Sequence, residues 1–211
     1  MEYLILVDNN DNPIGTEEKA KCHLPNGKLH RAFTVLLFNK DHKLLLTQRS
    51  ANKMLWPGDW DGTVASHPRQ SETYVSSAER RLPEELGISC KLDYLFKFEY
   101  HVPYKDIGSE NEICATLIGV VDDTSKIKLA KEEISDKKWV TPQELLDDVI
   151  KSPQTYCPWM IVALYFLSES KTDVLPEHKP ILNAWISADI KQVLEKPLKH
   201  HFPDNRWELK K

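Results

Sequence analysis

Residues 56–88 constrain the fold of this chain more than any other stretch. They begin with a Trp-Pro-Gly turn and continue as a predicted helix that starts near Ser71 and Glu72 and stops at Gly87, the usual left-handed C-terminal cap. The last turns of that helix carry Arg80, Arg81, Glu84 and Glu85. Arginine binds phosphate oxygens, and carboxylates bind the Mg²⁺ that bridges them. The helix therefore predicts a phosphate site, against the alternative of a solvated charged face.

Composition limits the class of protein. A chain of 211 residues suffices for one well-cored domain, and a net charge of −4 indicates no nucleic-acid partner. Its apolar runs are too short for a membrane span, and the N-terminus lacks a basic, apolar signal region. The four cysteines are scattered without a Cys-x-x-Cys pair. They predict free thiols in a reducing cytoplasm.

The order of elements predicts an α/β (α+β) fold. We expect strands at residues 3–8, 32–39, 44–49, 96–100 and 112–121, and a short strand ending at 140. Helices are expected at residues 142–151 and 158–167. Residues 1–169 are predicted to form the main domain. Residues 170–211 are rich in proline and charge, and we expect this extension, with an amphipathic helix at 181–194, to pack on the domain or on a partner subunit.

The helix of residues 71–86 also carries a family resemblance. The order Glu72-x7-Arg80-Arg81-Leu82-x-Glu84-Glu85-x-Gly87-Ile88 resembles the Nudix box. Two positions depart from it: Ser66 replaces the leading Gly, and Arg81 replaces a metal-binding Glu of Nudix hydrolases. With Arg81 at this position, the chain resembles the type 1 isopentenyl-diphosphate delta-isomerases. They use the Arg to hold a diphosphate that they do not hydrolyse. The resemblance implies a Nudix-type mixed-sheet α/β/α sandwich over about residues 2–168.

Metal ligands follow from the same resemblance. Glu110 and Glu112 share one face of a strand because side chains alternate, but spacing alone does not connect them to any histidine. The family's ligand elements match HLPNGKLHRAF, ASHP and ENEI in this chain. They imply one divalent ion (Mn²⁺, Mg²⁺ or Zn²⁺) held by His23, His30, His67, Glu110 and Glu112.

The substrate implied is a small-molecule prenyl diphosphate. The positions that match the family's diphosphate-binding residues are Lys19, Arg49, Lys53 and Arg81. Glu85 matches the carboxylate that helps to hold a second ion, a Mg²⁺ that bridges the diphosphate oxygens. Glu84 is acidic where the isomerases are not and where Nudix hydrolases are, so a Nudix pyrophosphohydrolase stays an alternative.

The resemblance also implies a reaction. The isomerases convert isopentenyl to dimethylallyl diphosphate by adding one proton to the alkene and removing another, through a carbocation-like state. A Glu backed by a Tyr lies on one side of the substrate, a Cys on the other, and a Trp stabilises the positive charge. In this chain Glu112 matches the Glu, Tyr100 the Tyr and Trp159 the Trp. The Cys position is Ala65.

Alanine carries no proton, so Ala65 leaves three explanations open. The cysteine was deliberately replaced, or the protein binds substrate with weak turnover, or it has moved to another prenyl reaction such as a terpenoid cyclisation on a longer chain. Ser66 is a doubtful substitute because neighbouring strand residues point to opposite faces, and Cys90, the nearest thiol in sequence, lies past the helix. Gly62, where the family has Asn, suggests a roomier pocket. The protein is expected to be a monomer or homodimer.

Overall fold

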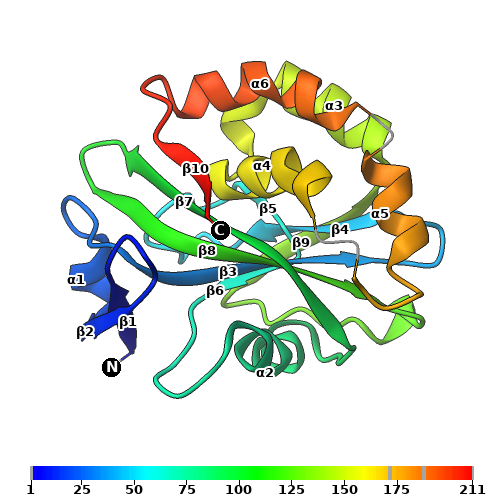
Figure 1. Cartoon of the computed structure of the whole chain (residues 1–211). Helices are drawn as coiled ribbons and strands as arrows, with labels where there is room; N and C mark the ends of the chain where they lie inside the picture. Colours follow the sequence, from blue (N-terminus) through cyan, green and yellow to red (C-terminus); the bar gives the residue numbers. More distant parts are fainter. Residues whose placement is uncertain (1, 171–172, 187–188, 211) are drawn as a thin grey trace.

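The computed structural model describes residues 2–170, 173–186 and 189–210. The helices are α1 (Lys19–His23), α2 (Tyr74–Leu86), α3 (Pro142–Lys151), α4 (Pro158–Tyr165), α5 (Lys179–Ile186) and α6 (Ile190–His201). Short 3-10 turns lie at Thr124–Lys126, Pro153–Thr155 and Phe166–Glu169. A mixed sheet forms the middle layer, with helix α2 packed on one face and helices α3, α4, α5 and α6 on the other (Figure 1). This arrangement confirms the predicted α/β fold class.

The sheet is built around strands β3 and β8. Its strands are β1 (Tyr3–Val7), β2 (Pro13–Glu18), β3 (His30–Phe38), β4 (Leu44–Arg49), β5 (Trp60–Asp61), β6 (Val64–Ser66), β7 (Leu92–Tyr104), β8 (Gly108–Val120), β9 (Ile134–Val140) and β10 (Trp207–Lys210). The order β10-β7-β8-β3-β1-β2 is extended by β6 and β4, which pair with β3, and by β5 and β9, which pair with β4. β3 and β8 run parallel, and both are buried and apolar, as strands covered on both faces are.

The sheet separates two hydrophobic cores, one on each of its faces. Leu36, Phe98 and Leu164 belong to the core beneath α3, α4 and α6, and Val35 and Leu82 belong to the core over α2. Consecutive residues of β3 enter different cores because side chains alternate along a strand.

Helix α2 begins later than the sequence predicted. The Thr73 hydroxyl accepts a hydrogen bond from the Ser76 backbone N–H, and the Ser76 side chain reciprocates, which makes Thr73 the N-cap. The predicted start at Ser71 and Glu72 is therefore wrong, and Ser71 has a φ of 75° in the preceding loop. The predicted end is confirmed, because Gly87 caps the helix with a φ of 67°.

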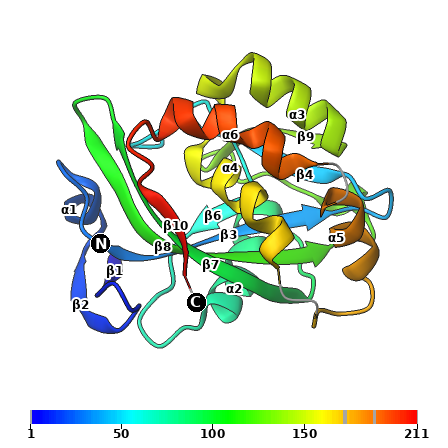
Figure 2. The same ribbon diagram turned by 45° about the horizontal axis from the view of Figure 1, so that its top comes forward.

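The extension folds into more structure than expected. The single helix predicted at 181–194 is wrong: α5 ends at Ile186, and α6 starts after Asp189, whose φ of 54° is left-handed, while residues 187–188 lie outside the described part. Helix α6 contacts α3 and α4, and β10, absent from the prediction, pairs with β7 (Figure 2). A domain division at residue 169 stays a prediction. In the part of the chain described, no helix is long and apolar enough to cross a membrane.

Candidate active site

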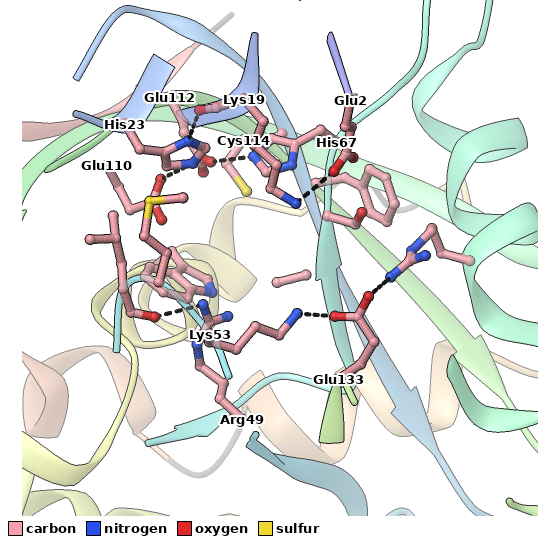
Figure 3. Close-up of a pocket in the computed structure, with 18 of the residues that line it drawn as sticks. Glu2, Lys19, His23, Arg49, Lys53, His67, Glu110, Glu112, Cys114 and Glu133 are labelled. Carbon is pink, nitrogen blue, oxygen red and sulfur yellow. Dashed lines mark hydrogen bonds and ion pairs between the residues drawn. The ribbon is translucent and has the colours of Figure 1, made fainter. Parts of the chain in front are cut away.

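A cavity of about 330 Å³ is lined by residues from both faces of the sheet, among them Trp159 of α4 and Arg81 of α2 (Figure 3). All the residues predicted for the site line it, except His30 and Glu85. The predicted residues that line it are Lys19, His23, Arg49, Lys53, Ala65, His67, Arg81, Tyr100, Glu110, Glu112 and Trp159. These positions lie on seven elements and their loops, so the fold brings together residues from most of the chain.

Three histidines and one glutamate form the buried end of the cavity. Ligand atoms of His23, His30, His67 and Glu112 all lie within 4.8 Å of one another. His30 and Glu112 are direct partners in the parallel pair β3–β8, and His67 follows the last residue of β6. Glu110 completes the group, with its Oε2 at 3.1 Å from His23 Nε2.

The free atoms of this cluster suit a cation. His23 Nδ1 and His30 Nδ1 each lie 2.7 Å from a backbone oxygen, that of Lys19 and that of Lys28, so their Nε2 atoms turn to the centre. Among the described residues, buried His30 Nε2 and Glu110 Oε2 have no hydrogen-bond partner, because the contacts of 3.3 Å to Glu112 Oε1 and 3.1 Å to His23 Nε2 lack the geometry. A divalent ion would satisfy both atoms at once, so these residues fit the metal that the family resemblance implies.

Glu112 also contacts Tyr100, the residue opposite it on β7. The Tyr100 hydroxyl donates a hydrogen bond of 2.5 Å to Glu112 Oε2, and His67 Nε2 lies 3.1 Å from Oε1. Burial favours the neutral acid, but contacts with His30 and Tyr100 outweigh it and hold the pKa of Glu112 below its usual value. The carboxylate is therefore ionised and lines the cavity, as a proton acceptor must.

The basic residues of the cavity are each paired with a carboxylate. Lys19 Nζ lies 2.8 Å from Glu2 Oε2, and Arg49 Nη1 lies 3.2 Å from Asp61 Oδ2. Sequence reasoning missed both carboxylates. Neither carries a motif: Glu2 is near the N-terminus, and Asp61 follows a tryptophan in a two-residue strand.

A third missed carboxylate, Glu133, bridges two cations. It pairs with Lys53 Nζ, and its Oε1 lies 3.1 Å from Arg81 Nη2. Arg81 also contacts Glu85 Oε1 at 2.6 Å within α2. Glu133 is in the loop before β9, far from α2 in sequence, and no spacing in the chain connects the two.

In the described part of the chain, no thiol lines the Ala65 side of the cavity in place of the family's cysteine. Ala65 on β6 is opposite Thr34 on β3, and both line one face of the sheet. Adding a Cβ to Gly62 would bring it within 2.9 Å of Thr34 Oγ1, so that hydroxyl fills the space and Gly62 does not enlarge the cavity. The thiol in the lining is Cys114, which lies two residues from Glu112 and so on its face of β8.

Comparison with known proteins identifies the family. A model of the NUDIX domain matches residues 28–160. The isopentenyl-diphosphate Delta-isomerase of Haloarcula marismortui is 40% identical over 172 residues, which are 77% of this chain and 89% of that protein. The chain belongs to the isopentenyl-diphosphate Delta-isomerase family of Nudix proteins. This confirms the family predicted from the Nudix-box residues.

Further relatives agree with this assignment. The isopentenyl-diphosphate Delta-isomerase of Halobacterium salinarum is 38% identical over 183 residues, 82% of this chain and 84% of that protein. The crystal structure of DR0079 from Deinococcus radiodurans matches with a TM-score of 0.63 at 21% identity and covers 77% of this chain and 97% of that one. The latter likeness concerns the fold alone, and it confirms the predicted Nudix-type sandwich.

Proposed function

We propose that this chain is an isomerase of isoprenoid biosynthesis that converts isopentenyl diphosphate to dimethylallyl diphosphate. One observation carries the proposal: an ionised Glu112, hydrogen-bonded to Tyr100, lies in a cavity with His23, His67 and Lys19 at one end and Arg49 and Lys53 at the other (Figure 3). Such a cavity can bind a ligand that has a reacting carbon centre near Glu112 and an anionic group near the cations. A prenyl diphosphate has both parts.

The two ends of the cavity would hold different ions. The histidine cluster with Glu110 and Glu112 offers nitrogen and carboxylate ligands, which suit Mn²⁺, Mg²⁺ or Zn²⁺. Glu85, buried behind Arg81 of the lining, would hold a Mg²⁺ that supplies further positive charge for the diphosphate. Bound ions would supply positive charge for the diphosphate and keep Glu112 ionised. Lys19, Arg49, Lys53 and Arg81 would bind the remaining oxygens.

Protein groups account for one of the two proton transfers. Glu112 would exchange a proton with the substrate through Oε2, the oxygen that Tyr100 holds in place, and the indole of Trp159 would stabilise the cation-like state. On the opposite side Ala65 supplies no proton, so turnover depends on another donor. Cys114 is the thiol in the lining, but it shares the Glu112 face of β8, and burial raises its pKa well above the usual value, which disfavours the thiolate left after a proton is donated.

Deuterium uptake from D₂O into isopentenyl diphosphate tests the proposal. We would incubate the chain and its Ala65→Cys variant with Mg²⁺ and Mn²⁺, and use Glu112→Gln as the inactive control. Label in both proteins supports the isomerase with a substitute for the Cys. Label only with Ala65→Cys indicates an intact site that lacks its second acid–base group.

Absence of label from both proteins would contradict the isomerase proposal. Two alternatives would then be tested directly. Release of inorganic phosphate would support a pyrophosphohydrolase, and products from a longer prenyl diphosphate would support a cyclase. Under the proposal the enzyme acts in the cytoplasm, which suits its four free thiols, and its oligomeric state, monomer or homodimer, is open to light scattering.

A further inference from the structure

Asp61 lies behind the cavity and contacts two residues that line it. Its side chain is 3% exposed at the end of the two-residue strand β5. Oδ1 accepts hydrogen bonds of 2.8 Å from Trp159 Nε1 and 2.7 Å from the Gly62 N–H, and Oδ2 accepts one of 3.2 Å from Arg49 Nη1. The carboxylate therefore holds the indole and the guanidinium at once.

Arg49 is fixed on its other edges as well. Its Nε donates to the Trp56 carbonyl at 3.0 Å and its Nη2 to the Leu55 carbonyl at 2.9 Å. The guanidinium also lies over the Trp159 ring, 5.1 Å from its centroid. Arg49, Trp159 and Asp61 thus form a closed triangle in which each member contacts the other two.

This triangle connects the two ends of the cavity. Arg49 belongs to the cations that would bind the diphosphate, and Trp159 to the aromatic surface that would face the developing positive charge. A carboxylate that accepts the indole N–H hydrogen bond makes the ring richer in electrons, and this strengthens its attraction for a cation. The same negative charge balances Arg49, which otherwise would be an unpaired buried cation.

We propose that Asp61 is a positioning residue that fixes the Trp159 indole and strengthens it as a cation-stabilising surface while moderating the charge of Arg49. The inference rests on the proposed function, since it assigns a role in that reaction. It requires the negative charge of Asp61 as well as its shape. Asn at this position keeps the size and one acceptor oxygen, so Asp61→Asn isolates the charge.

The control for this substitution is Asp59→Asn. Asp59 is half-buried near Arg49, where burial raises its pKa to about 6 and Arg49 lowers it in part, but no hydrogen bond joins its carboxylate to Arg49 or Trp159 in the described residues. Both variants therefore remove one negative charge near the same arginine. Only Asp61→Asn changes the contact with the indole.

Three readouts decide the inference. Asp61→Asn should shift the Trp159 indole N–H resonance in ¹H–¹⁵N spectra upfield, with the peak assigned from Trp159→Phe, since an amide is a weaker acceptor than a carboxylate. It should lower kcat at least tenfold, measured in the Ala65→Cys background if the native chain turns over slowly. Affinity for inorganic diphosphate with Mg²⁺ should stay equal or increase, because Arg49 loses its counter-charge. Asp59→Asn should leave the resonance in place and change kcat less than twofold.

Several results would overturn the inference. An unmoved resonance would exclude the contact in solution, and an unchanged kcat would exclude its role. Parallel loss of kcat and diphosphate affinity, accompanied by a lower Tm, would mean that Asp61 only supports the fold. The resonance and the diphosphate titration need no turnover, so they test the inference even if no isomerase activity is found, a result that would contradict only the proposed function.

Discussion

Tyr100 and Glu112 are direct partners across β7 and β8, and the Tyr100 hydroxyl donates a 2.5 Å hydrogen bond to Glu112 Oε2. The other carboxylate oxygen, Oε1, lies within 3.3 Å of both His30 Nε2 and His67 Nε2. The two oxygens of Glu112 therefore face different partners. Oε1 faces the histidines and suits a metal, whereas Oε2 is held by Tyr100 and suits proton exchange.

Replacing Glu112 by Gln should abolish proton transfer. The amide cannot accept a proton from substrate, and loss of a general base costs about 10²–10⁴-fold in rate. We expect deuterium uptake to fall at least about 100-fold, while inorganic diphosphate binding by calorimetry changes little because the cations lie elsewhere. Tyr100→Phe, which removes only the hydroxyl, should give a smaller loss. Full activity in Glu112→Gln would exclude the assignment.

Glu133 should oppose the binding of a metal-free diphosphate. Its carboxylate forms ion pairs with the cations Lys53 and Arg81, which a diphosphate would otherwise bind. Burial favours its neutral form, but the two cations outweigh burial and lower the pKa of Glu133 to about 2, so it stays ionised from pH 5 to 8. Glu133→Gln removes the carboxylate that pairs with Lys53 and one of the three that pair with Arg81. Inorganic diphosphate with EDTA present should then bind about three- to tenfold more tightly, as loss of about 1 kcal/mol of competing ion pairing predicts.

Glu132→Gln is the matched control for Glu133. Glu132 also lines the cavity, but among the described residues its side chain makes no ion pair with Lys53 or Arg81. Calorimetry at two salt concentrations should show the gain with Glu133→Gln alone, and high salt should reduce it. Weaker diphosphate binding in Glu133→Gln would show that Glu133 helps to hold the ligand.

The parts of the fold that the sequence predicted are those with strong local signals. Residues 32–38 are apolar except for Thr34, and the structure places them in β3. Gly87 ends α2 because the left-handed conformation suits glycine. β10 was not predicted: it is short and charged, and it exists because β7 offers an edge to pair with.

The predicted site depended on the family resemblance. Spacing alone could align Glu110 with Glu112, but only the parallel register of β3 and β8 brings His30 beside Glu112. Asp61 and Glu133 were missed because their partners are distant in sequence. Cys114 could have been found, since alternation from Glu112 puts it on the same face of the strand.

The histidine cluster should bind metal independently of activity. A ligand that binds only the folded state raises Tm, so Mn²⁺ should stabilise the EDTA-treated protein by several degrees in a thermal melt. His30→Gln removes a buried ligand atom and should abolish most of this increment. His200→Gln alters an exposed histidine on α6 and should keep it. An equal increment in both variants would place the metal elsewhere.

The packing of the C-terminal extension should depend on pH through His201 on α6. Burial lowers the pKa of His201 to about 4, and its Nε2 lies 2.9 Å from the Pro153 carbonyl. The unfolded chain, with an ordinary His pKa near 6.5, binds the proton first, so the stability from this neutral histidine is present above that pH and is lost as pH falls toward 4.

Urea unfolding at pH 7 and pH 4.5 measures this loss. Up to about 3 kcal/mol of the decrease in unfolding free energy should belong to His201. His201→Gln should reduce the difference between the two pH values, whereas His200→Gln, its exposed neighbour, should not. The same dependence on pH in both variants would mean that His201 is not buried in solution. His201 belongs to the extension, whereas Pro153 precedes α4 in residues 1–169. A single urea unfolding transition whose free energy depends on pH in this way would therefore indicate that residues 170–211 unfold together with the domain that holds the site.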